Sequence, residues 1–212
     1  MHNAELLLFD SNDVFGGLII DWGVKGLENA NIEKLIASLK KEQANSKKGT
    51  LKLLIPGDNE PWAVCVWNQG TNESYLLGIQ EEHGWYFPDD YQSFLRVSDG
   101  CLMFTHPHYG GGIDLLNLQR IINIHDEMEQ IPSHWYPIAW TDYIAGAICI
   151  DSERCRNNIF PYIFFLDAMK EISEAIPIHC DFKTWFGRLI LCQGSEFWLW
   201  EYHDKINFRN EN

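Results

Sequence analysis

The sequence is poor in basic residues and has no long apolar run. Lys and Arg number 16 against 30 Asp and Glu, which gives a formal net charge of −14. Such a chain repels phosphate backbones and anionic lipids, so we expect neither nucleic acid nor a membrane as its partner. No stretch approaches the roughly 20 apolar residues of a membrane span, and the N-terminus lacks the features of a signal peptide. We expect a cytoplasmic protein, whose acidity either serves solubility or steers a basic protein partner.

The cysteines form no CxxC pair, the spacing of many metal-binding and redox motifs. They are scattered along the chain, and without a secretion signal they are expected to be free thiols in a reducing compartment. The six are Cys65, Cys101, Cys149, Cys155, Cys180 and Cys192.

Motifs of the common hydrolases, kinases and nucleotide-binding proteins are also missing. The sequence has no GxSxG, HRD or DFG set. Gly110–Gly112 lacks the GK[ST] or GxGxxG context of a phosphate loop, so a flexible turn between strands is the better interpretation. The adjacent carboxylates Glu81–Glu82 and Asp89–Asp90 are explained by helix ends. We therefore expect no catalysis and no cofactor.

One pair of histidines is spaced for a metal ion. On a strand, His106 and His108 would point to the same face and could share an ion. The third ligand would be Asp114, or His125 with Asp126, and neither choice has a recognised spacing. Structural or surface histidines are the simpler interpretation, so no metal is predicted.

Amphipathic segments and short apolar runs indicate the fold class. Apolar residues recur with helical spacing in three segments, and 74–84 is ambiguous between helix and strand. The helical segments are 31–41, 88–100 and 181–191, with Asn31, Asp89 and Asp181 as candidate caps. Strands are predicted at 51–55, 62–67, 101–108, 113–118, 135–142, 146–151, 159–166 and 197–202. This order predicts an α+β fold, a single domain over 1–212 with a mainly antiparallel sheet and helices packed on one side.

The stretch from Pro88 to Gly100 is the most specific part of the chain. It joins a proline, a Tyr-x-x-Phe-Leu helix and a closing Asp-Gly, after the acidic segment GIQEEHGWYFP. A leucine-bearing strand, a Pro-Ile-Ala strand, a strand ending in an acidic residue and an aromatic helix follow. The positions are Tyr91, Phe94, Leu95 and Asp99, then 113–118, Pro137–Ala139, Asp142, Cys149–Asp151 and 182–189. This order resembles the SUKH superfamily of Smi/Knr-type cell-wall regulators and bacterial toxin-immunity proteins, over 73–191, with 1–72 a divergent portion.

The resemblance implies a non-catalytic protein-binding module, most concretely an immunity protein that binds and neutralises a cognate toxin such as a nuclease. An intracellular adaptor or regulator of the Smi/Knr type is the alternative, and a small metal-dependent enzyme centred on His106 and His108 is a third. A basic toxin domain would be met by carboxylates, with aromatic side chains as anchors. The partner-binding residues that we nominate are Trp85, Asp89, Asp90, Asp99, Asp114, Asp142 and Asp151.

Overall fold

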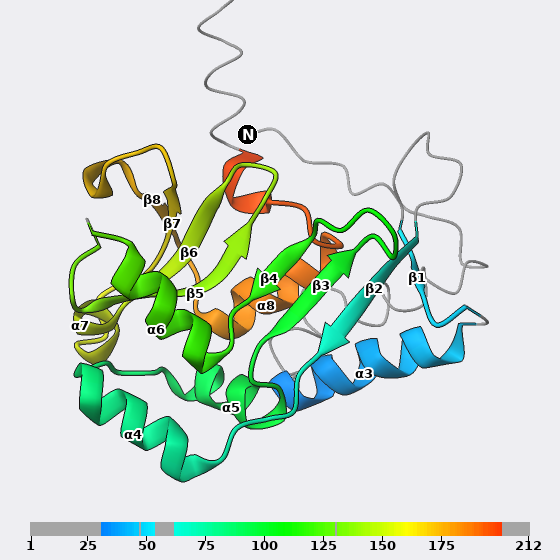
Figure 1. Ribbon diagram of the computed structural model, residues 1–212, viewed down its shortest axis with the longest axis horizontal. Coiled ribbons are helices and arrows are strands. Elements are labelled where there is room, and N and C mark those ends of the chain that lie inside the picture. The colour runs from blue at the N-terminus through cyan, green and yellow to red at the C-terminus, as the bar shows by residue number, and fades with distance from the viewer. Residues whose placement is uncertain (1–30, 47, 54–61, 130, 201–212) are drawn as a thin grey trace, which may run out of the picture.

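The computed structural model describes residues 31–46, 48–53, 62–129 and 131–200 of the chain (Figure 1). Within these residues, eight strands lie side by side in sequence order, and each pairs antiparallel with the next. The fold is α+β, as predicted. The strands are β1 (Leu51–Lys52), β2 (Trp62–Trp67), β3 (Cys101–Thr105), β4 (Ile113–Leu115), β5 (Trp135–Thr141), β6 (Gly146–Asp151), β7 (Ile163–Asp167) and β8 (Ile176–Ile178).

Helices occupy the connections before, within and after this meander. In the described part of the chain, the α-helices are α3 (Ile32–Asn45), α4 (Glu73–His83), α5 (Asp89–Val97), α6 (Leu118–Glu127), α7 (Ser152–Arg156) and α8 (Phe182–Leu191). Two 3₁₀ turns, η1 (Ile172–Glu174) and η2 (Phe197–Leu199), complete the elements.

The first described helix forms as its sequence pattern predicts. Asn31 caps α3 by accepting the backbone N–H of Lys34 at 3.0 Å, which satisfies one of the free donors of the first turn. The apolar stripe of α3 is buried, and the helix contacts α5 and β2. This packing closes one end of the core.

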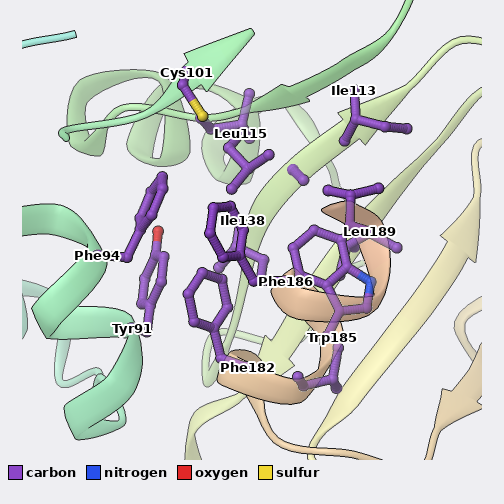
Figure 2. Close-up of a cluster of buried hydrophobic side chains, with 14 of the residues drawn as sticks. Tyr91, Phe94, Cys101, Ile113, Leu115, Ile138, Phe182, Trp185, Phe186 and Leu189 are labelled. Atoms are coloured by element: carbon purple, nitrogen blue, oxygen red, sulfur yellow. The ribbon is translucent and has the colours of Figure 1, made fainter. Parts of the chain in front are cut away.

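An aromatic cluster between α5 and α8 forms the centre of the core. Phe94 on α5 lies 5.6 Å from Phe182 and 5.4 Å from Phe186 on α8, measured between ring centroids. Tyr91 lies 4.9 Å from Phe182, and all four side chains are fully buried. Figure 2 shows these rings meeting the aliphatic side chains of the strands, among them Ile138. Each such ring contributes about 1.5–3 kcal/mol by its removal from water.

Most of the predicted elements are confirmed, and the others differ as follows. Residues 74–84 form a helix, α4, which Asn72 caps by accepting the N–H of Tyr75 at 2.9 Å. Pro88, rather than Asp89, is the cap position of α5. Helices α6 and α7, the turn η1 and strand β8 were not expected. Residues 197–199 form the 3₁₀ turn η2 instead of a strand. Residues 54–55 and 201–202 of two predicted strands, and 1–30 of the divergent portion, lie outside the described residues.

Helices cover the two faces of the sheet unequally. The cluster of α3, α5 and α8 covers one face, as predicted, whereas α6 lies on the other face and contacts β5 (Figure 1). Leu118 and Ile121 of α6 are buried in the core, and Arg120 of the same helix pairs with Asp114 on β4. Helix α6 therefore rises above the second face of the sheet and forms one side of the candidate site.

Candidate functional site

Two of the nominated residues lie inside the protein. Trp85 is 3% exposed, its Nε1 donates to the carbonyl oxygen of Ser133 at 2.9 Å, and its ring stacks on His83 at 4.5 Å. Asp151 is 5% exposed and caps α7 by accepting the N–H of Arg154 at 2.9 Å. Their nomination as surface contacts is wrong, because local charge and aromatic content do not report burial.

Two further nominated carboxylates connect helices. Asp90 accepts the backbone N–H of Lys183 at 2.8 Å and that of Tyr91 at 2.9 Å, so it joins the start of α5 to the start of α8. Asp99 accepts the N–H of Leu118 at 2.9 Å, which fixes the first residue of α6. Burial raises the pKa of both carboxyls, while these N–H groups oppose the rise. Both residues therefore have a structural role.

The remaining three nominated carboxylates do not form one surface. Asp89 is exposed at the start of α5. The segment before it lies beside the end of β6, where the N–H of Tyr86 donates to Oγ of Ser152 at 2.6 Å. Asp142 is exposed in the turn at the opposite end of β5 and β6. A strand of this length separates them by roughly 20 Å. Asp114 lies between these ends and pairs with Arg120.

The histidine pair lies in a turn rather than on a strand. His106 and Gly110 close the turn through reciprocal backbone hydrogen bonds of 3.1 Å. The Nδ1 of His106 accepts the N–H of His108 at 3.1 Å, so this nitrogen is already used within the turn. Among the described residues, no group of three His, Cys, Asp or Glu side chains could hold a metal ion. None of the described helices has the length and apolar character to cross a membrane.

A groove lies on the second face of the sheet. It has a volume of about 810 Å³ and lies between α6 and the turn that joins β7 to η1. Its apolar side chains are Ile124, Met128, Ile131, Trp140, Leu166, Ala168 and Met169, and its charged ones are Arg120, Glu127, Glu129, Asp167, Lys170 and Glu171.

The floor of this groove exists because the central strands are apolar on both faces. In β6, Ile148 faces the main core, whereas Cys149 belongs to a second buried cluster with Leu166 of β7. Trp140 is half-buried beside this cluster. It pairs in register with Asp114, so both side chains lie on the face that α6 covers. Asp114 is thus the nominated residue that adjoins the groove.

The side chains at the rim of the groove carry a net negative charge. Its two cations are already paired within the chain, Arg120 with Asp114 and Lys170 with Glu174, whose Oε1 lies 3.0 Å from the lysine Nζ. These two acceptors are additional to the four rim carboxylates, which are Glu127, Glu129, Asp167 and Glu171. The groove therefore offers an apolar floor inside a ring of excess negative charge.

A second hollow, with a volume of about 700 Å³, lies at the far end of the strands. Exposed tyrosines occupy two adjacent hairpin turns there, Tyr109 at 88% and Tyr143 at 85% exposure. Asp142 and Tyr143 line this hollow together with Gly112, a residue of positive φ whose added Cβ would lie 2.4 Å from the carbonyl oxygen of Met103. The glycine turn predicted from the sequence is confirmed.

Sequence reasoning missed the groove because it missed α6. The available signal was Asn117, which caps α6 by accepting the N–H of Arg120 at 2.9 Å, followed by buried Leu118 and Ile121 at helical spacing. Alternation along β7 could not reveal the floor, because Phe165 and Leu166 are both buried, on opposite faces.

Comparison with known proteins places the chain in a family. The model of the SMI1 / KNR4 family (SUKH-1) matches residues 70–188, more than half of the 212 residues, and the chain belongs to this family. The matched region contains the whole groove, whereas α3, β1 and β2 precede it.

Two relatives from Bacillus subtilis (strain 168) are similar to the chain. "Uncharacterized protein YnaB" is 29% identical over 137 residues, which cover 62% of this chain and 88% of the relative. "Uncharacterized protein YobM" is 24% identical over 170 residues, which cover 76% of this chain and 89% of the relative. The likeness to both extends over most of each relative's length.

Proposed function

We propose that this chain is a non-catalytic immunity protein that binds a cognate toxin and neutralises it by covering a basic functional surface. The observation that carries this proposal is the groove on the second face of the sheet, whose apolar floor is ringed by excess carboxylates. Apolar centres inside polar rims are typical of protein interfaces. Membership of the SMI1 / KNR4 family supports the proposal.

The charge of the chain fits a toxin that acts on an anionic substrate. With a net charge of −14, the protein attracts a basic domain over a distance of about a Debye length, roughly 8 Å at physiological salt. Carboxylates then occupy the positions where the substrate's phosphates would lie. All six cysteines are free thiols, which suits the reducing cytoplasm in which such a toxin would act.

Co-expression tests this function. The toxin domain encoded directly beside the gene of this chain is expressed in a sensitive host, with and without the chain, and growth is measured. The proposal expects growth to be restored and a one-to-one complex to be recovered. A toxin domain from an unrelated locus is the control and should kill in both cases. Killing that the chain does not relieve, or the absence of any toxin domain beside the gene, would overturn the proposal in favour of an adaptor role.

A further inference from the structure

We infer that the groove between α6 and the β7–η1 turn is the docking site for a basic segment of the partner protein. The expected segment carries one large apolar side chain flanked by Lys or Arg. The identity of the partner as a toxin rests on the proposed function, whereas the chemistry of the segment rests on the groove itself.

The excess of carboxylates over cations in the groove predicts which residues flank the anchor of the segment. Since Arg120 and Lys170 already pair with Asp114 and Glu174, the four rim carboxylates exceed the cations of the groove. An acidic or neutral segment would leave this excess charge uncompensated as water is removed, which costs free energy. A segment with two or more cations compensates it, so the rim selects for Lys and Arg.

The apolar floor defines the anchor of the segment. Trp140 and Leu166 offer an apolar base, and Met169 stands at the edge with 90% of its surface exposed. Methionine is flexible and adapts its shape to a bound apolar side chain. An exposed methionine beside a half-buried tryptophan therefore fits an anchor residue inserted from a partner.

The edges of the sheet favour side-chain docking over strand addition. Among the described strands, the edge strands are β1, with two residues, and β8, with Pro177 at its centre. Pro177 has no N–H, and a two-residue strand gives a partner little backbone to pair with. Both edges therefore favour docking through side chains, which the groove can receive.

Affinity measurements with the cognate toxin domain test the docking site. Glu127→Lys and Met169→Glu change the rim and the anchor wall at exposed positions, so the fold is retained. Glu82→Lys and Leu77→Glu make the same changes on exposed positions of α4, outside the groove. We expect each groove variant to weaken binding at least about tenfold and each α4 variant to leave it within about twofold. If the groove variants and the α4 variants change the affinity equally, the docking site is wrong.

A peptide probe separates this inference from the proposed function. A short synthetic peptide with a central Phe flanked by Arg is titrated into the isotope-labelled chain, and an analogue with Glu in place of Arg is the control. We expect NMR shifts at Ile124, Met128 and Met169 with the basic peptide alone. If the toxin fails to bind but these shifts occur, the proposed function is wrong and the docking site stands. If the toxin binds and the groove variants behave like the α4 variants, the docking site is wrong and the function stands. If the toxin does not bind and the peptide causes no shifts, both the proposed function and the docking site are rejected.

Discussion

The carboxylate of Asp167 accepts the backbone N–H of Met169 at 2.8 Å, and this bond shapes the turn that presents Met169 to solvent. Asp167→Asn keeps an acceptor oxygen but removes the charge, whereas Asp167→Ala removes both. We therefore expect the wild type to bind the toxin domain most tightly, Asp167→Asn less tightly and Asp167→Ala least tightly. The free energy of unfolding should change by less than about 1 kcal/mol in both variants. Calorimetric titration and thermal unfolding of the three proteins measure these effects, and equal affinities for all three would contradict the role of this turn.

The pH dependence of stability reports on Asp90. Burial raises the pKa of its carboxyl, so the folded protein binds this proton more tightly than the unfolded chain. The contribution of Asp90 to the free energy of unfolding is therefore fully present below its usual pKa of 3.8. This contribution is lost as the pH rises through the higher pKa that Asp90 has in the folded protein.

Asp90→Asn tests this sign because the amide is neutral at every pH. We expect the free energy of unfolding of the wild type to exceed that of the variant by more at about pH 4 than at about pH 7, measured by urea unfolding. Asp89→Asn changes the exposed neighbour in the same turn and is the matched control. A wild-type advantage that grows with pH would show that the sign is wrong.

The aromatic cluster between α5 and α8 carries a large share of the stability. Phe94 is completely buried between the rings of Phe182 and Phe186, so Phe94→Ala leaves a cavity and is expected to cost about 3–5 kcal/mol. Leu77→Ala truncates an exposed apolar side chain and should change stability by about 0.5 kcal/mol or less. Chemical unfolding measures both, and a Phe94→Ala loss below about 1 kcal/mol would contradict this packing.

Gln43 on α3 acts as a substitute strand partner for Cys65 on β2. Its Oε1 accepts the N–H of Cys65 at 2.7 Å, and its Nε2 donates to the carbonyl oxygen of Cys65 at 3.2 Å. Gln43→Ala leaves two backbone groups of a buried residue without these bonds, so we expect a loss of about 1–3 kcal/mol. Asn45→Ala, at an exposed position of the same helix, is the control. Slower hydrogen exchange at Cys65 in the Gln43 variant than in the wild type would contradict this account.

The elements that sequence reasoning recovered have strong local signals. The helix from Ile32 has a capping Asn31 and an apolar stripe, and the α8 helix is capped by Asp181, which accepts the N–H of Thr184 at 2.7 Å. The differences arise where tertiary contacts decide. Trp85 looked like a surface anchor because acidic residues surround it in sequence, yet the fold brings Ser133 to its ring nitrogen.

The groove could not be predicted from the sequence, because tertiary contacts form it as well. Its floor residue Trp140 and its rim residue Glu127 belong to segments that are separate in the chain, and they meet only where α6 packs against β5. Charge along the sequence predicted an acidic binding surface but could not say which carboxylates would share it. Five of the seven nominated residues are instead buried or occupied by structural bonds and ion pairs, namely Trp85, Asp90, Asp99, Asp114 and Asp151.

Hydrogen–deuterium exchange of the chain, alone and bound to the toxin domain encoded beside its gene, tests the central claim most directly. The account predicts slower exchange in the complex over 118–129 and 163–171, the segments that flank and floor the groove. Exchange in α4 and in the turn at 106–112 should stay unchanged. Protection confined to α4, or to the tyrosine-bearing turns at Tyr109 and Tyr143, would contradict the assignment of the groove as the binding surface.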